Sequence, residues 1–183
     1  MKKDDLITKN ILITGNPGVG KTTLIQNIIS KFSISAGGFY TSEVRNADGK
    51  RWGFKITSLD GIEGIMASTD IMSKYKISRY WIDVEAIDRV GVTAIKEAIK
   101  HNEFIVIDEI GRMELFSKKF QDVAMEALDS SKIVLGTITA KDIAFTKKVK
   151  ERQDTKIITL TRQNFSEIET YIERLLSKKL SGI

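Results

Sequence analysis

The sequence predicts an α/β fold with a mostly parallel, doubly wound sheet that has helices on both faces. Short apolar runs of strand length alternate with longer segments whose apolar residues recur every three or four positions. Strands that are joined by helices in this way pair in parallel. The turn Asn46-Ala47-Asp48-Gly49 joins two strands directly and predicts an antiparallel hairpin over about 38–58, added at one edge of the sheet.

The predicted strands are short runs rich in apolar and β-branched residues. The clearest is 104–108, because its unbroken run Phe-Ile-Val-Ile indicates a strand buried on both faces. Strands are expected at 11–14, 38–44, 51–58, 104–108, 132–139 and 156–161, with weaker patterns at 63–67 and 78–82.

The predicted helices each carry one apolar stripe with a spacing of three or four residues. Helices are expected at 22–31, 83–100, 117–128, 142–150 and 165–176. The chain contains no repeat, low-complexity segment or Gly/Ser linker. We therefore expect residues 1–183 to form a single domain.

The composition excludes several kinds of site. The absence of cysteine excludes disulfides, thiolate zinc sites and iron–sulfur clusters, and a single histidine excludes multi-histidine metal sites. The apolar runs are too short to cross a membrane, and the N-terminus lacks the apolar core of a signal peptide. We expect a cytoplasmic monomer with no membrane partner. The net charge of +5 fits an anionic ligand and at most weak binding to nucleic acid.

A glycine-rich segment after the first strand matches the phosphate-binding pattern G-x-x-x-x-G-K-[ST], the P-loop or Walker A motif. It reads Gly15-Asn16-Pro17-Gly18-Val19-Gly20-Lys21-Thr22 and opens the first predicted helix. Glycines let the backbone fold around a phosphate, and the free N–H groups of a first helical turn attract an anion. Residues 15–23 are therefore expected to bind the phosphates of a nucleotide.

Three side chains of this segment have expected roles. Lys21 is expected to reach the β- and γ-phosphates, and to support catalysis there. The hydroxyl of Thr22 is expected to ligate Mg²⁺, while Thr23 reaches toward the α-phosphate.

An acidic pair follows the buried strand 104–108. Asp108 and Glu109 stand at its carboxyl end, where open α/β sheets bind their ligands. This is the form of a Walker B motif, in which Asp108 holds Mg²⁺ through water. Glu109 is then placed to polarise a water for attack on the γ-phosphate, which makes it the expected catalytic base.

The same pair indicates a RecA-like core. In that arrangement one strand lies between the P-loop strand and the Walker B strand. Strand 132–139 is the candidate for this middle position, and its Thr137 or Thr139 would point at the site.

Four blocks of the chain resemble the small P-loop nucleoside-triphosphatases of thermophiles, which are similar to the animal cancer-related nucleoside-triphosphatase. The blocks are Gly15–Thr23, Gly38–Arg45 with Gly49–Phe54, Asp108–Leu115 and Leu160–Asn164. The resemblance implies slow, Mg²⁺-dependent hydrolysis of many nucleoside triphosphates, ATP and GTP among them. It also implies a RecA-like core with an added hairpin. Because no segment looks like a base-reading motif, we expect low selectivity for the base.

A hydrolase that works alone needs a cation to meet the charge of the transition state. Arg112, three residues after Glu109, is the first candidate, although related proteins often carry lysine at this position. Met113 and Glu114 are expected to hold the loop around it. The further candidates for the cation are Arg45, Arg51, Arg152 and Arg162.

Two other functions stay open at this point. The first is a nucleoside or nucleotide kinase, although Glu109 favours water as the nucleophile and no arginine-rich lid is evident. The second is a nucleotide-gated module that binds RNA or DNA and hydrolyses nucleotide slowly, although the small net charge argues against strong nucleic-acid binding.

Overall fold

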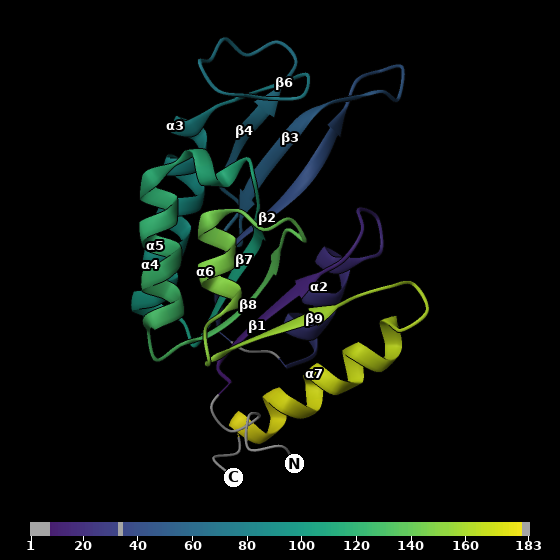
Figure 1. The fold of residues 1–183 in the computed structure, drawn as a ribbon, viewed down its shortest axis with the longest axis vertical. Helices are drawn as coiled ribbons and strands as arrows, with labels where there is room; N and C mark the ends of the chain where they lie inside the picture. Colours follow the sequence, from purple (N-terminus) through teal and green to yellow (C-terminus); the bar gives the residue numbers. More distant parts are fainter. Residues whose placement is uncertain (1–7, 33–34, 181–183) are drawn as a thin grey trace.

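The computed structural model describes residues 8–32 and 35–180 (Figure 1). Within these residues nine strands form one sheet, in the order β5-β6-β4-β3-β2-β7-β8-β1-β9. The strands are β1 (Asn10–Thr14), β2 (Ala36–Arg45), β3 (Arg51–Ser58), β4 (Glu63–Ser68), β5 (Lys76–Ile77), β6 (Tyr80–Ile82), β7 (Phe104–Ile110), β8 (Ile133–Ile138) and β9 (Thr155–Thr159). No helix in the described part of the chain is long and apolar enough to cross a membrane.

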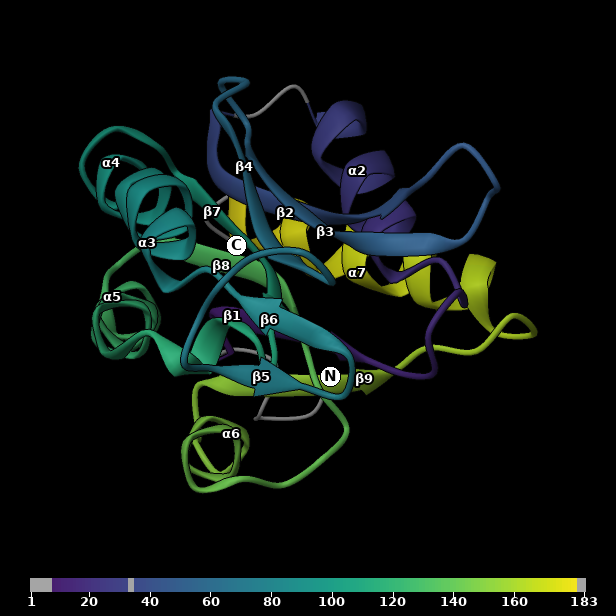
Figure 2. The ribbon, with the colours of Figure 1, turned by 90° about the horizontal axis from the view of Figure 1, so that it is seen from above.

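The helices lie on both faces of the sheet, as expected (Figure 2). They are α2 (Lys21–Phe32), α3 (Val84–Ala86), α4 (Thr93–His101), α5 (Lys118–Asp129), α6 (Ala144–Lys150) and α7 (Phe165–Leu180), with a π-helical segment η1 (Ile87–Val92) and a 3₁₀ turn η2 (Glu114–Phe116).

Two apolar clusters hold these layers to the sheet. Successive side chains of a strand point to opposite faces. On β1, Leu12 belongs to the cluster under α4 and α5, whereas Ile11 and Ile13 belong to the cluster under α2 and α7. The central strands are therefore buried on both faces, as the unbroken apolar run 104–107 predicts.

The core of the sheet is parallel and has the expected middle strand. β8 pairs with β1 on one side and with β7 on the other, both in parallel. The P-loop strand and the Walker B strand are thus separated by β8, which confirms the RecA-like arrangement. The carboxyl ends of these three strands lie at one edge of the sheet, where the site is built.

The hairpin is larger and less separate than the sequence predicts. β2 and β3 pair antiparallel, as expected, but the first residues of β2, Ala36–Phe39, pair in parallel with β7. Gly38 permits this close approach, because a Cβ on it would lie 2.0 Å from the carbonyl oxygen of Val106. Beyond β3, the antiparallel strands β4, β6 and β5 continue the sheet, so the hairpin is not its edge.

The predicted helix 83–100 consists of three segments. Asp83 accepts a hydrogen bond of 2.9 Å from the N–H of Ala86 and so caps α3, after which η1 and α4 follow. Within η1, Gly91 packs so closely on the sheet that a Cβ would lie 2.8 Å from Cδ1 of Ile56. The π-helical segment η1 thus lies where the chain packs closely against β3.

Candidate active site

The glycine-rich segment forms the loop between β1 and α2, as the sequence predicts. Gly15 has φ +149°, a backbone conformation that side chains with a Cβ rarely adopt. A Cβ on Gly15 would also lie 2.4 Å from the carbonyl oxygen of Leu160. The segment that follows β9 therefore packs directly against the loop, although the two lie far apart in the sequence.

Lys21 lies over the loop that precedes it. Its Nζ donates hydrogen bonds to the carbonyl oxygens of Gly15 (3.0 Å) and Asn16 (3.3 Å). These contacts hold the ammonium group at the concave side of the loop, where a phosphate would bring negative charge.

Asp108 connects three elements at the carboxyl edge of the sheet. Thr22, in the first turn of α2, donates to its Oδ2 at 2.5 Å, and Thr137, on β8, donates to its Oδ1 at 2.7 Å. Burial raises the pKa of Asp108, and these two hydroxyl groups and the charge of Lys21 oppose that shift. The structure thus brings together the P-loop, the Walker B strand and the middle strand, with Thr137 facing the site.

Glu109 follows Asp108 through a cis peptide bond and is half-buried. Burial raises the pKa of its carboxyl, the neighbouring charge of Asp108 raises it further, and Lys21 opposes the shift. A carboxyl whose pKa is raised toward neutrality is better suited to take a proton than an exposed one.

A third carboxyl group lies beside this pair. Glu114 is 5% exposed, and burial together with the charges of Glu109 and Asp108 raises its pKa to about 8. A Cβ on Gly111 would lie 2.8 Å from Oε2 of Glu114 and 3.0 Å from Oε1 of Glu109, so both carboxyl groups flank the same backbone position. The sequence predicts for Glu114 only a role in holding the loop, because the segment 108–114 has no periodicity that indicates burial.

A cavity of about 260 Å³ adjoins Glu109. Its walls come from the Walker B loop on one side and from the outer strands on the other, and they include Thr41, Phe54, Met66, Ile77 and Thr139. Arg112 and Glu114 also line it. The sequence does not predict this cavity, because the cavity forms only where the antiparallel strands β3, β4 and β5 pass the end of β7.

The candidate arginines have different surroundings. Arg112 is exposed at the cavity and forms no ion pair within the described residues. Arg45 and Arg51 both pair with Glu43 on the hairpin, and Arg51 also donates to the hydroxyl of Tyr80 at 2.9 Å. They serve to hold the outer strands together.

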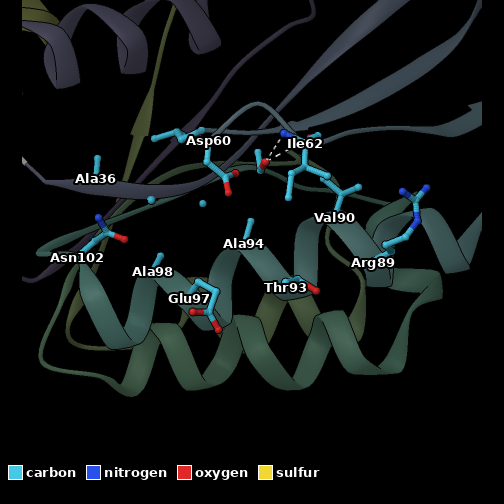
Figure 3. Close-up of a pocket in the computed structure, with 14 residues that line it drawn as sticks. Ala36, Asp60, Ile62, Arg89, Val90, Thr93, Ala94, Glu97, Ala98 and Asn102 are labelled. Carbon is cyan, nitrogen blue, oxygen red and sulfur yellow. Dashed lines mark hydrogen bonds between the residues drawn. The ribbon is translucent and has the colours of Figure 1, made fainter.

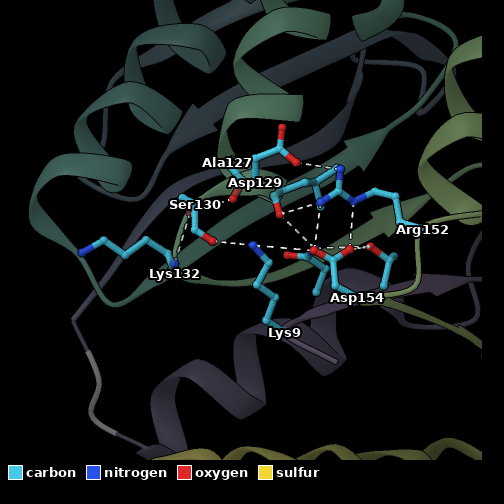
Figure 4. A network of polar contacts seen from close by, with 10 residues as sticks. Lys9, Ala127, Asp129, Ser130, Lys132, Arg152 and Asp154 are labelled. Carbon is cyan, nitrogen blue, oxygen red and sulfur yellow. Dashed lines mark hydrogen bonds and ion pairs between the residues drawn. The ribbon is translucent and has the colours of Figure 1, made fainter. Parts of the chain in front are cut away.

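Arg152, a further candidate for the cation, lies in a polar network with Asp129 and Asp154 (Figure 4). It pairs with Asp154 at 2.9 Å and with Asp129 at 2.7 Å, and it donates to the carbonyl oxygen of Leu128. The carbonyl oxygen of Asp154, the residue before β9, accepts a hydrogen bond from the N–H of Asn10, the first residue of β1. This network therefore lies at the amino ends of the strands, whereas Asp108 lies at their carboxyl ends. The expectation for Arg152 is therefore wrong.

Arg162 lies close to the phosphate-binding loop. It belongs to the segment after β9, whose Leu160 donates its N–H to the carbonyl oxygen of Thr14 at 2.8 Å. The ring of Phe165, at the start of α7, covers the other end of the loop, 2.9 Å from where a Cβ on Gly20 would lie. The exposed Arg162 is thus on the same side of the molecule as the P-loop.

Comparison with known proteins agrees with this site. A family model described as NTPase matches residues 10–173. The chain is 46% identical over 154 residues to the nucleoside-triphosphatase THEP1 of Thermotoga maritima, covering 84% of this chain and 87% of the relative. It is 40% identical over 176 residues to the THEP1 of Methanocaldococcus jannaschii, covering 94% and 98%.

Two solved structures have the same fold. The crystal structure of THEP1 from Aquifex aeolicus superposes with a TM-score of 0.79 at 35% identity, over 89% of this chain and 96% of that one. The solution structure of a human cancer-related nucleoside triphosphatase gives a TM-score of 0.78 at 29% identity, over 92% and 97%. Since the family model spans most of the sequence and the relatives match over nearly their whole length, the chain belongs to the NTPase family.

Proposed function

We propose that this protein hydrolyses nucleoside triphosphates to diphosphate and phosphate, with Mg²⁺ and with little preference for the base. The observation that carries the proposal is the contact of Asp108 with both Thr22 and Thr137, directly beside Glu109. This contact supports a site at one edge of the sheet in which the loop 15–23 would bind phosphates, Thr22 and Asp108 would bind the metal, and Glu109 would act as the base. The names of the relatives support the same reaction.

The loop residues would bind the triphosphate. Residues 15–20 offer backbone N–H groups to the β-phosphate, and Lys21 exchanges its contacts with the carbonyl oxygens of the loop for the β- and γ-phosphates. Thr23, the next residue but one on α2, faces the α-phosphate.

The oxygens of Thr22 and Asp108 fit a Mg²⁺ ion. A hydroxyl and a carboxylate are hard oxygen ligands, and Mg²⁺ keeps several waters, so two protein groups are sufficient. Mg²⁺ bound there would neutralise the charge that develops on the phosphates. Among residues 8–32 and 35–180 no group of three or more His, Cys, Asp or Glu side chains is arranged so that it could hold a metal ion, and we propose the pair Thr22 and Asp108 as the metal site.

Glu109 and Arg112 have separate roles in the proposed chemistry. Glu109 accepts the proton of the attacking water, and its raised pKa suits that task. Arg112, the exposed cation on the same cavity, meets the charge that develops on the γ-phosphoryl group. We also propose that the protein acts as a cytoplasmic monomer whose partners are the nucleotides, with at most weak affinity for nucleic acid.

Measurement of phosphate release tests this function. ATP, GTP, CTP and UTP are compared with and without Mg²⁺, using the Glu109→Gln variant as the negative control. We expect release from all four nucleotides, dependent on the metal. A preference for one base above about a thousandfold, equal to about 4 kcal/mol, would contradict the low selectivity, because it would require a hydrogen-bonded base pocket.

A further inference from the structure

The cavity beside Glu109 is larger than the hydrolysis of a nucleotide by water requires. Its volume is about 260 Å³, whereas about 10–15 Å³ on the same measure is enough to hold one water. The cavity is also distinct from the phosphate-binding loop, because no residue of 15–23 lines it.

The walls of the cavity suit a flat, partly apolar molecule. Phe54 on β3, Met66 on β4 and Ile77 on β5 form one side, and Met113 adds a flexible thioether from the Walker B loop. Phe54 packs edge-on against Tyr80, with ring centroids 5.1 Å apart, which fixes the position of that wall. Thr41 and Thr139 add two hydroxyl groups that could bind polar substituents.

The charges of the cavity offer an anionic occupant no net attraction. Arg112 is exposed and Glu109 carries the opposite charge, whereas Glu114, whose pKa is raised to about 8 by burial, is largely protonated near neutral pH. An acceptor that already carries a phosphate dianion would meet the charge of Glu109 on entry. A neutral molecule with hydroxyl groups and a ring, such as a nucleoside, matches the walls and the charges together.

The position of the cavity beside Glu109 indicates which part its occupant would take in phosphoryl transfer. In phosphoryl transfer the attacking oxygen and the leaving oxygen lie roughly in line with the γ-phosphorus. Glu109 acts on the attacking side, so a molecule held against Glu109 stands where the nucleophile stands.

We propose that this cavity is an acceptor pocket, from which a nucleoside hydroxyl competes with water for the γ-phosphoryl group. This inference rests on the role of Glu109 in the proposed hydrolysis. The hydroxyl oxygen forms a new bond to the γ-phosphorus, and its proton passes to the Glu109 carboxylate. The bond from the γ-phosphorus to the β–γ bridging oxygen breaks, and the nucleoside diphosphate leaves with that electron pair. The products are a nucleoside monophosphate and a diphosphate.

A second cavity provides a matched control. It also measures about 260 Å³, and it lies between α4 and the strands β2 and β3, lined by Ile62, Arg89 and Glu97 among others (Figure 3). It opens beside Ala36–Gly38, at the start of β2 and so at the edge of the sheet away from Asp108. Substitution of Ile77 by tryptophan fills the first cavity, and Ile62→Trp places the same ring at the second.

The experiment uses GTP labelled in the γ-phosphate as the donor and adenosine as the probe. Labelled AMP then arises only by transfer. We expect the unchanged protein and Ile62→Trp to form labelled AMP, and Ile77→Trp to form at least tenfold less. The unchanged protein and Ile62→Trp should release phosphate from GTP without adenosine at rates within about twofold, and the labelled AMP formed by Ile77→Trp is expressed relative to that variant's own rate of phosphate release. AMP offered in place of adenosine should give no labelled ADP.

Three results would overturn the inference. They are the absence of labelled AMP from protein that hydrolyses GTP, inhibition of hydrolysis by adenosine without transfer, and equal transfer by Ile77→Trp and Ile62→Trp. The reaction without adenosine tests the proposed function separately, because a failure to release phosphate there would contradict hydrolysis whatever the acceptor does. Ile77→Phe, which adds less volume, replaces Ile77→Trp if the latter does not fold.

Discussion

Thr22 donates a hydrogen bond of 2.5 Å to the carboxylate of Asp108, across 86 positions of the chain. The contact joins the first turn of α2 to the end of β7, and Thr137 on the intervening strand completes it from the other side. The two groups proposed to hold Mg²⁺ are thus held in place by contacts between α2, β7 and β8.

Removal of the Lys21 cation should weaken nucleotide binding. Hydrogen bonds to charged groups contribute about 1.5–3 kcal/mol, so Lys21→Ala should lower the affinity for a nucleoside triphosphate by about 10- to 100-fold. Titration with a fluorescent nucleotide analogue measures this change. Lys31→Ala is the matched control, since Lys31 lies on the same helix but pairs with Glu173 on the surface. Equal affinities of the two variants would contradict the assignment of the P-loop.

Arg112→Ala should lower kcat more than it raises KM. A cation that meets charge developing on the γ-phosphoryl group stabilises the transition state more than the bound substrate. The fall in kcat should be at least tenfold, and Arg112→Lys should restore part of it. Arg89→Ala, at an exposed arginine of the second cavity, should leave both constants unchanged. A normal kcat of Arg112→Ala would contradict its role as the cation that meets the charge on the γ-phosphoryl group, and Arg162 would then be the next candidate.

Glu114 should make folding stability depend on pH. An unfolded glutamate has a pKa of about 4.3, and in the folded protein the pKa of Glu114 is raised to about 8. Its contribution is therefore fully present below about pH 4.3 and is lost as the pH rises toward 8, by about 1.4 kcal/mol per pH unit at most.

Glu114→Gln should flatten this dependence, because the amide does not ionise. Denaturant unfolding at intervals between pH 5 and pH 8 gives the slopes. Glu126→Gln, on the exposed face of α5, should keep the slope of the unchanged protein. Parallel slopes for all three proteins would show that Glu114 is not buried as the structure has it.

Arg152→Ala should affect stability and not activity. The substitution leaves Asp154 and Asp129 without their shared partner, and the loss of such charged hydrogen bonds costs about 1.5–3 kcal/mol. Thermal unfolding should therefore shift downward, whereas kcat/KM should stay within about twofold. Arg174→Ala, on the exposed side of α7, should change neither quantity. A large loss of kcat in folded Arg152→Ala would bring this residue back as a candidate for the cation.

Local spacing was enough to predict the centre of the site. The P-loop and the pair Asp108–Glu109 are each encoded in a few consecutive residues next to a strand, so their positions follow from the motif and the parallel sheet. The middle strand β8 also followed, because the acidic pair indicates the order of the strands.

The surroundings of the site could not be predicted in the same way. The strands β4, β5 and β6 are short and their partners depend on contacts across the sheet, so the sequence indicated only weak strands at 63–67 and 78–82. The cavity beside Glu109 depends on β3, β4 and β5, since Phe54, Met66 and Ile77 line it together with the Walker B loop only after the sheet has formed.

The role of Glu109 as the catalytic base is tested by comparing Glu109→Gln with Asp108→Asn. Nucleotide binding and phosphate release are measured on each variant. Glu109→Gln keeps the size of the side chain but removes the basic oxygen, so affinity should hold within a few-fold while turnover drops by about a hundredfold or more. Asp108→Asn should weaken binding of the Mg²⁺–nucleotide complex as well, because it alters the metal site. Normal hydrolysis by Glu109→Gln would contradict the account, since this carboxylate would then not be the catalytic base.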